Sequence, residues 1–172
     1  MRDAQGHELS GATTEGIRYF NSAVRAFTLI YGDATGLYDA ALKVCPELVM
    51  AYLGKAWPLV LANDPAMAVL ARALLNAVCE LPMNDRERAH LTALTHAAIG
   101  HRASAVAILD RHLMSHPFDL IAHMAALQME RTPRAFPLGS RPIGPCPTPV
   151  VQGSGELRDH AVVLQLRIGR SR

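Results

Sequence analysis

The fold of this chain is decided by residues Asn84 to Gln128, NDRERAHLTALTHAAIGHRASAVAILDRHLMSHPFDLIAHMAALQ. The stretch contains three helical segments, separated by a glycine-containing turn and by a proline. Apolar residues of the first segment, many of them alanine, recur at helical spacing and predict a helix that a neighbour can approach closely. Gly100 is the expected left-handed end of that helix. Pro117 ends the second helix, because it biases His116 away from helical geometry. A helical hairpin followed by a third helix is therefore predicted.

The first helix of this stretch carries a start signal. Asn84 is the expected N-cap, and Glu87 three residues later resembles the second half of a capping box. We expect the charged side chains of the stretch to cap, pair or solvate helix surfaces. In the alternative, arginine and histidine side chains line the concave side of a superhelix and clamp a peptide carboxylate. The charged residues concerned are Asp85, Arg86, Glu87, Arg88, Asp110 and Arg111.

The same pattern occurs twice upstream. Proline closes helical segments at Pro46, Pro82 and Pro117, at intervals of 36 and 35 residues, which lie in the range of helical repeats. Asp64 followed by Pro65 is a further helix start signal. Pro58 is expected to kink or shorten the helix that contains it. The predicted helices are 14–31, 34–44, 47–62, 65–80, 85–99, 102–115 and 118–129.

Composition agrees with an all-α fold. Hydrophobic residues make up 50% of the chain and aromatic residues only 5%, which favours helix packing over a sheet. In a repeat array each hairpin covers its neighbour, so the core is spread along a line. Residues 1–130 are therefore predicted to form helical hairpin repeats like those of tetratricopeptide proteins, stacked in an α-solenoid with a right-handed superhelix.

Four sequence motifs resemble those of one family within that class. The motifs are GHELS at 6–10, VCPELVMA at 44–51, RERAHLTAL at 86–94 and HPFDLIA at 116–122. On these motifs residues 3–129 resemble the N-terminal part of the tetratricopeptide repeat protein 38 family. The resemblance implies a degenerate helical-repeat fold without an assigned catalytic activity, and it supplies no ligand. The positions that match the family's motifs, mostly structural, are Arg86, Glu87, His90, Leu94, Gly100, Ala105, His116, Pro117 and Asp119.

The resemblance stops near residue 129, where the family continues with further helical repeats. Residues 131–172 hold six of the eleven prolines, seven arginines and only two acidic residues. Helix is excluded through most of this stretch. A fragment or out-of-frame ending is one explanation, and a functional disordered linker is another. Nucleic-acid binding is the least favoured, because dispersed arginines with one aromatic residue, Phe136, make a weak electrostatic footprint.

Histidines and cysteines are the residues of this chain that could bind a metal ion or form disulfides. His112 and His116 have the i, i+4 spacing of a zinc-binding pair, and Asp119 and His123 repeat it. Pro117 turns the chain between the two pairs, so the sequence does not place them around a common centre, and surface or groove histidines are the favoured interpretation. The cysteines are widely and irregularly spaced, which supports neither a disulfide framework nor a metal site. They are Cys45, Cys79 and Cys146.

No phosphate-binding glycine loop or membrane-spanning apolar run is present in the sequence, and the N-terminus lacks a secretory signal. We expect a cytoplasmic, non-catalytic scaffold that binds a protein or peptide partner, with no cofactor, no metal, no nucleic acid and no membrane. Two alternatives remain open. The chain is a non-functional fragment of a longer helical-repeat protein, or it is a metal-dependent or hydrolytic enzyme that uses its histidine cluster.

Overall fold

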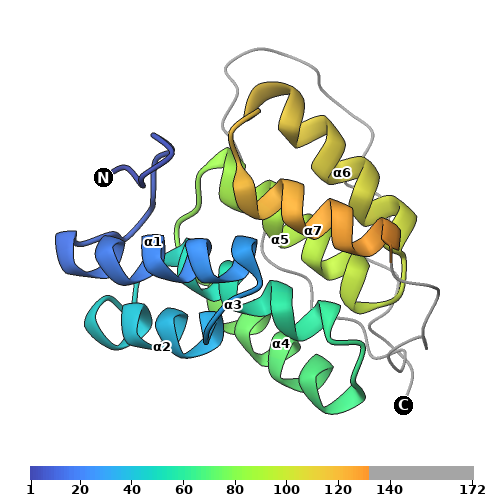
Figure 1. The fold of residues 1–172 in the computed structure, drawn as a ribbon, viewed down its shortest axis with the longest axis horizontal. Helices are drawn as coiled ribbons and strands as arrows, with labels where there is room; N and C mark the ends of the chain where they lie inside the picture. The colour runs from blue at the N-terminus through green and yellow to red at the C-terminus, as the bar shows by residue number, and fades with distance from the viewer. Residues whose placement is uncertain (132–172) are drawn as a thin grey trace, which may run out of the picture.

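A computed structural model describes residues 1–131, and the predicted Pro/Arg-rich tail therefore lies outside the described residues apart from Arg131. Within that part the chain is helical, as predicted, and its only β-pairing is an isolated bridge between Arg2 and Glu8. None of the described helices is both long and apolar enough to cross a bilayer. The helices are α1 (Thr14–Leu29), α2 (Ala34–Val44), α3 (Val49–Leu61), α4 (Pro65–Val78), α5 (Asp85–Ala98), α6 (Arg102–Ser115) and α7 (Leu120–Arg131) (Figure 1).

Local signals set the ends of these helices. The capping box at the start of α5 is present: the Asn84 side chain accepts from the backbone N–H of Glu87, and the Glu87 carboxylate accepts from that of Asn84. Asp64 caps α4, which begins at Pro65. Gly100 follows α5 with a φ of 86°, in the left-handed region where glycine carries no Cβ penalty. Each predicted helix is therefore found, with ends within two residues of those expected.

Pro58, which was expected to kink or shorten α3, does not end the helix. The helix continues to Leu61, and the amide of Ala62 still donates to the Pro58 carbonyl. Only the last turn follows the proline, and α3 is buried on most of its surface. Tertiary packing therefore outweighs the local cost of the proline, as is usual for a short helix held in a core.

Consecutive helices pair as hairpins, α1 with α2, α3 with α4, and α5 with α6. Helix α3 lies at the centre and contacts α1, α2, α4, α5 and α7. Helix α7 packs on α6 and also returns to α1 and α3, so the last described helix meets the first (Figure 1). The N-terminal segment before α1 lies near the start of α5, far away along the chain. Segments at both ends of the described chain thus meet around one end of α5.

Gly54 in α3 lets the buried ring of Tyr38 pack directly against the backbone of that helix. A Cβ built on Gly54 would lie 2.5 Å from the ring of Tyr38, and Tyr38 is fully buried. In an exposed helix, glycine to alanine would stabilise by up to about 1 kcal/mol. Here the ring has no room to move, so we expect Gly54→Ala to lower the free energy of unfolding by about 1–3 kcal/mol, measured by urea denaturation. The double variant Gly54→Ala, Tyr38→Leu should recover part of the loss; a stabilised single variant would contradict the packing.

Candidate functional site

Five buried polar residues from four segments of the chain meet between α5, α6 and α7. We call them the Arg86 cluster: Asp3, Arg86, His90, His112 and Asp119. Each of the five is at most 7% exposed. Buried charges are rare unless paired, so this concentration is the most distinctive feature of the described residues.

Arg86 lies in the first turn of α5 between two carboxylates. Its Nε and Nη2 donate to the two oxygens of Asp119, at 2.7 and 3.3 Å, and its Nη1 donates to Asp3 at 2.9 Å. The two-point contact with Asp119 matches the fork of the guanidinium to the plane of a carboxylate. Asp119 directly precedes α7 and also accepts from the amide of Ala122, so the same carboxylate caps that helix.

Two histidines share one oxygen of Asp119. The Nε2 atoms of His90 and His112 each lie 3.0 Å from Asp119 Oδ2. His90 Nδ1 accepts from the indole N–H of Trp57 at 3.0 Å, and indole nitrogen is only a donor. The proton of a neutral His90 must therefore sit on Nε2, from where it donates to Asp119.

Burial and charge shift the ionisation of these groups. Burial by itself raises the pKa of Asp119, but His90, His112 and Arg86 outweigh it and hold this pKa well below its ordinary value. Burial would lower the pKa of Arg86, yet its contacts with Asp119 and Asp3 raise it. For His90, burial dominates and lowers the pKa. At neutral pH the cluster therefore holds an ionised Arg86 between two carboxylates, beside a neutral His90.

The spacing of the cluster alone would admit a metal ion. The ligand atoms of His90, His112 and Asp119 lie within 4.8 Å of one another. A zinc-bound histidine offers the lone pair of one nitrogen and donates the N–H of the other to an acceptor. His90 faces the opposite partners, because its Nδ1 meets the N–H of Trp57 and its Nε2 must donate. Binding a metal would orphan the fully buried Trp57 donor and compete with Arg86 for Asp119, so these residues do not fit a metal site.

A second carboxylate, Glu87, ties the N-terminal segment to α5. One oxygen of Glu87 completes the capping box with Asn84, and the other accepts from the amide of Ser10. The Asn84 side chain donates to the carbonyl of Glu8. Glu87 is fully buried. Its role is therefore to join two segments 77 residues apart, in addition to capping a helix.

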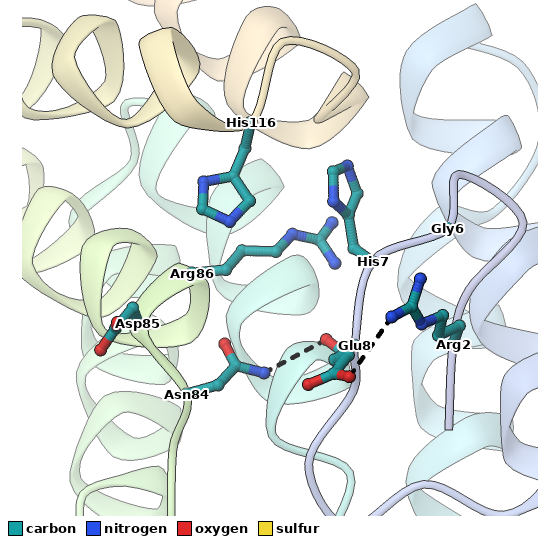
Figure 2. Close-up of a pocket in the computed structure, with 8 residues that line it drawn as sticks. All are labelled: Arg2, Gly6, His7, Glu8, Asn84, Asp85, Arg86 and His116. Carbon is teal, nitrogen blue, oxygen red and sulfur yellow. Dashed lines mark hydrogen bonds and ion pairs between the residues drawn. The ribbon is translucent and has the colours of Figure 1, made fainter.

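A cavity of about 360 Å³ opens beside the cluster, between the N-terminal segment and the start of α5. Figure 2 shows the guanidinium of Arg86 below the rings of His7 and His116, with Asp85 turned away from them. His7 Nε2 and His116 Nδ1 are both buried without a hydrogen-bond partner. The positive charge of Arg86 is already matched by two carboxylates, so with neutral histidines the cavity wall offers no excess positive charge to a free anion.

Several of the residues singled out in the sequence come together here, and two expectations are corrected. Arg86 was expected to pair locally or to solvate a helix surface, but it is buried and pairs with the distant Asp3 and Asp119. His112 was expected at a surface or groove, and Pro117 was expected to separate it from Asp119. Instead, the turn at Pro117 brings Asp119 back against His112, and both are buried. His112 of the first i, i+4 pair and Asp119 of the second are therefore in direct contact.

The remaining motif positions serve the fold. Leu94 and Ala105 are fully buried, Gly100 provides the left-handed turn, and Pro117 lies in the turn before α7. Cys45 is buried and Cys79 is half-buried; Cys146 lies outside the described residues.

Two members of the site were not found from the sequence. Asp3 precedes the first helix, in a segment with no periodic pattern, and Trp57 looks like an ordinary core residue. The only available signal was chemical: a lone tryptophan in a buried helix needs an acceptor for its N–H. Neither a protein-family model, nor a curated protein, nor a solved structure matches this chain.

Proposed function

We propose that this chain is a non-catalytic protein-interaction scaffold of the tetratricopeptide class, whose hairpins stack as a solenoid in the cytosol. The hairpin order supports the stacking. The Arg86 cluster supports a structural rather than a catalytic role for the histidines, because both nitrogens of His90 are engaged and Asp119 is saturated with donors. Arg86, which in the alternative interpretation would bind a peptide carboxylate, pairs instead with Asp3 and Asp119 of the chain itself.

An exposed apolar turn is the observation that favours binding of a protein. Leu29, Ile30 and Tyr31 follow one another at the end of α1, and they are 62%, 76% and 81% exposed. Beside them lies an open groove of about 350 Å³ with a mainly apolar wall. Its apolar lining includes Ala26, Phe27, Ala34, Pro58 and Leu61. The partner proposed here is a protein segment that inserts apolar side chains into this groove, with Tyr31 as an anchor of the kind enriched at interfaces.

Backbone strain at the same turn strengthens the proposal. Ile30 has a φ of 50°, in the left-handed region that glycine normally occupies at the end of a helix. For a β-branched residue this conformation costs about 1–2 kcal/mol. A residue that is both strained and exposed contributes little to folding, and such positions are associated with function.

Replacing Ile30 by glycine separates binding from stability. We expect Ile30→Gly to raise the free energy of unfolding by about 1 kcal/mol, because the strain is relieved. The same change should weaken partner binding, because an apolar contact is lost. Urea denaturation measures the first effect. For the second, a photo-crosslinking amino acid is placed at position 31, and the yield of its protein adduct is compared with and without Ile30→Gly.

The matched control places the crosslinker at position 19. Tyr19 is exposed on α1, but it does not line the groove. A discrete adduct from position 31, absent from position 19 and reduced by Ile30→Gly, supports the proposal. Equal adducts from both positions, or an unchanged yield in the glycine variant, would show that this groove is not the binding surface.

A further inference from the structure

The segment before α1 is held on the body by contacts with α5 and α7. We call residues 1–11 the N-terminal strap. On α5, Arg86 binds Asp3, and the buried carboxylate of Glu87 accepts from the amide of Ser10. On α7, the first amide of the helix, that of Leu120, donates to Gln5. Leu9 is the strap's buried apolar residue. The strap is therefore attached mainly through polar contacts, two of which involve the charged side chains of Arg86 and Glu87.

A row of histidine rings runs from the strap to the interior. The ring centroid of His7 lies 5.7 Å from that of His116, and His116 stacks on His112 at 4.4 Å with an angle of 15° between the planes. His112 in turn lies 5.4 Å from His90. Four of the eight histidines of the chain thus form one continuous series of ring contacts, and they come from the strap, α5, α6 and the turn before α7.

Charged groups surround this row on every side. Those of the strap are Arg2, Asp3 and Glu8, those of α5 are Asp85, Arg86 and Glu87, and Asp119 directly precedes α7. Tyr38 of α2 is a titratable group close enough to interact electrostatically with Arg86 and Asp119. Of these, Arg2, Glu8 and Asp85 are exposed at the rim. Burial raises the pKa of Tyr38, so it stays neutral. The charges in direct contact with the row are therefore one guanidinium and the carboxylates that it pairs with.

We propose that the histidine row makes the N-terminal strap a proton-sensitive latch, closed at neutral pH and released when protonation of His116 adds positive charge beside His7, His112 and Arg86. The ring contact that strap closure adds to His116 is that of His7, 5.7 Å away between centroids, and Arg86 lines the same cavity, so a positive charge on His116 is disfavoured in the closed arrangement. His116 Nδ1 is buried without a hydrogen-bond partner, and burial disfavours a charge on this ring in the closed arrangement. Displacing the strap takes His7 away from His116 and exposes His116 to water, while the stack of His116 on His112 stays in place.

The direction of the pH effect follows from His116. Burial, with His112 and His7 adding to it, lowers the pKa of His116 in the closed arrangement. A released strap returns this group towards its ordinary pKa of about 6.5. Protons therefore bind the released arrangement more strongly, so closure is complete above about pH 6.5 and weakens as the pH falls below it. Asp119 stays ionised throughout this window because its pKa is held low.

Hydrogen exchange on the full chain tests the latch. The amides of Ser10 and Leu120 report strap closure, since Ser10 donates to Glu87 and Leu120 donates to Gln5 of the strap. Between pH 7.5 and 5.5, we expect their protection factors, corrected for the intrinsic exchange rate, to fall several-fold more than those of α1 and α2. One unit of pKa difference between closed and released His116 corresponds to a limit of about tenfold.

Two variants make the result specific. His116→Gln removes the titrating ring and should abolish the extra loss of strap protection at low pH. His101→Gln is the matched control, because His101 contacts His96 at the far turn of α5 and not the row, and it should behave like the unmodified chain. The proposal is overturned if strap and body lose protection in parallel, or if His116→Gln retains the full acid-induced loss in the strap.

Discussion

Arg86→Ala is expected to lower the free energy of unfolding by about 3–5 kcal/mol, the largest effect of any single truncation considered for this chain. The substitution leaves the carboxylates of Asp3 and Asp119 buried without their shared cation. The amide and imidazole donors that remain do not replace the lost cation, so the desolvation of the two carboxylates is no longer fully offset. Urea denaturation followed by the fluorescence of Trp57, the only tryptophan, measures the loss.

Arg88 provides the matched control two positions along the same helix. Its side chain is 43% exposed and pairs with an almost fully exposed Asp85 at 3.4 Å. Exposed pairs of this kind contribute about 0–1 kcal/mol, so Arg88→Ala should change stability little. A similar loss in both variants would mean that helix propensity or net charge, and not the buried pairing, underlies the effect of Arg86→Ala.

The contrast between Arg86 and Arg88 shows what the sequence could and could not predict. Both are arginines in the first turn of one helix, and local reasoning gave them the same role. The helix itself was predictable, because Asn84 and Glu87 signal its start and Gly100 its end through interactions within a few residues. Burial of Arg86 depends on Asp3 and Asp119, which lie 83 and 33 residues away. No local pattern carries that information.

The turn at Pro117 explains the second difference. Proline ends α6 as expected. The sequence alone does not place His112 and Asp119, which lie on either side of this proline, around a common centre. A tight reversal instead places the start of α7 beside the last turn of α6, and the carboxylate that caps α7 reaches the histidine. A helix stop says where regular structure ends but not where the chain goes next. Sequence thus predicted the elements around the site, while the site itself arose from how they pack.

The same packing bears on where a partner could bind. Arg86 is paired with Asp119 and Asp3, so its guanidinium is not free to bind a peptide carboxylate. Helix α7 lies against α1 and α3. The charged side chains of the Arg86 cluster are therefore used within the chain, where they join the N-terminal segment and the start of α7 to α5. The exposed apolar turn at Ile30 borders a different cavity, whose lining shares no residue with the one beside the Arg86 cluster. The Arg86 cluster and the proposed binding surface thus involve different residues of the described chain.

Asp119→Asn tests the cluster from its acidic side, and we expect a loss of about 3 kcal/mol or more at pH 7. Both oxygens of Asp119 accept from donors, so whichever one becomes an amide N–H₂ meets a donor of Arg86. Asp110→Asn, at an exposed position of α6, is the control and should change stability by less than about 0.5 kcal/mol.

The pH dependence of that loss separates charge from shape. Because the folded-state pKa of Asp119 is depressed, its stabilisation is present above the unfolded pKa of about 3.9 and is lost as the pH falls further. The difference between the unmodified chain and Asp119→Asn should therefore be constant from pH 7 to 5 and shrink below about pH 4. A difference that persists unchanged at pH 3 would show that the asparagine disturbs packing rather than ionic pairing, and Arg86 would then be held by geometry more than by charge.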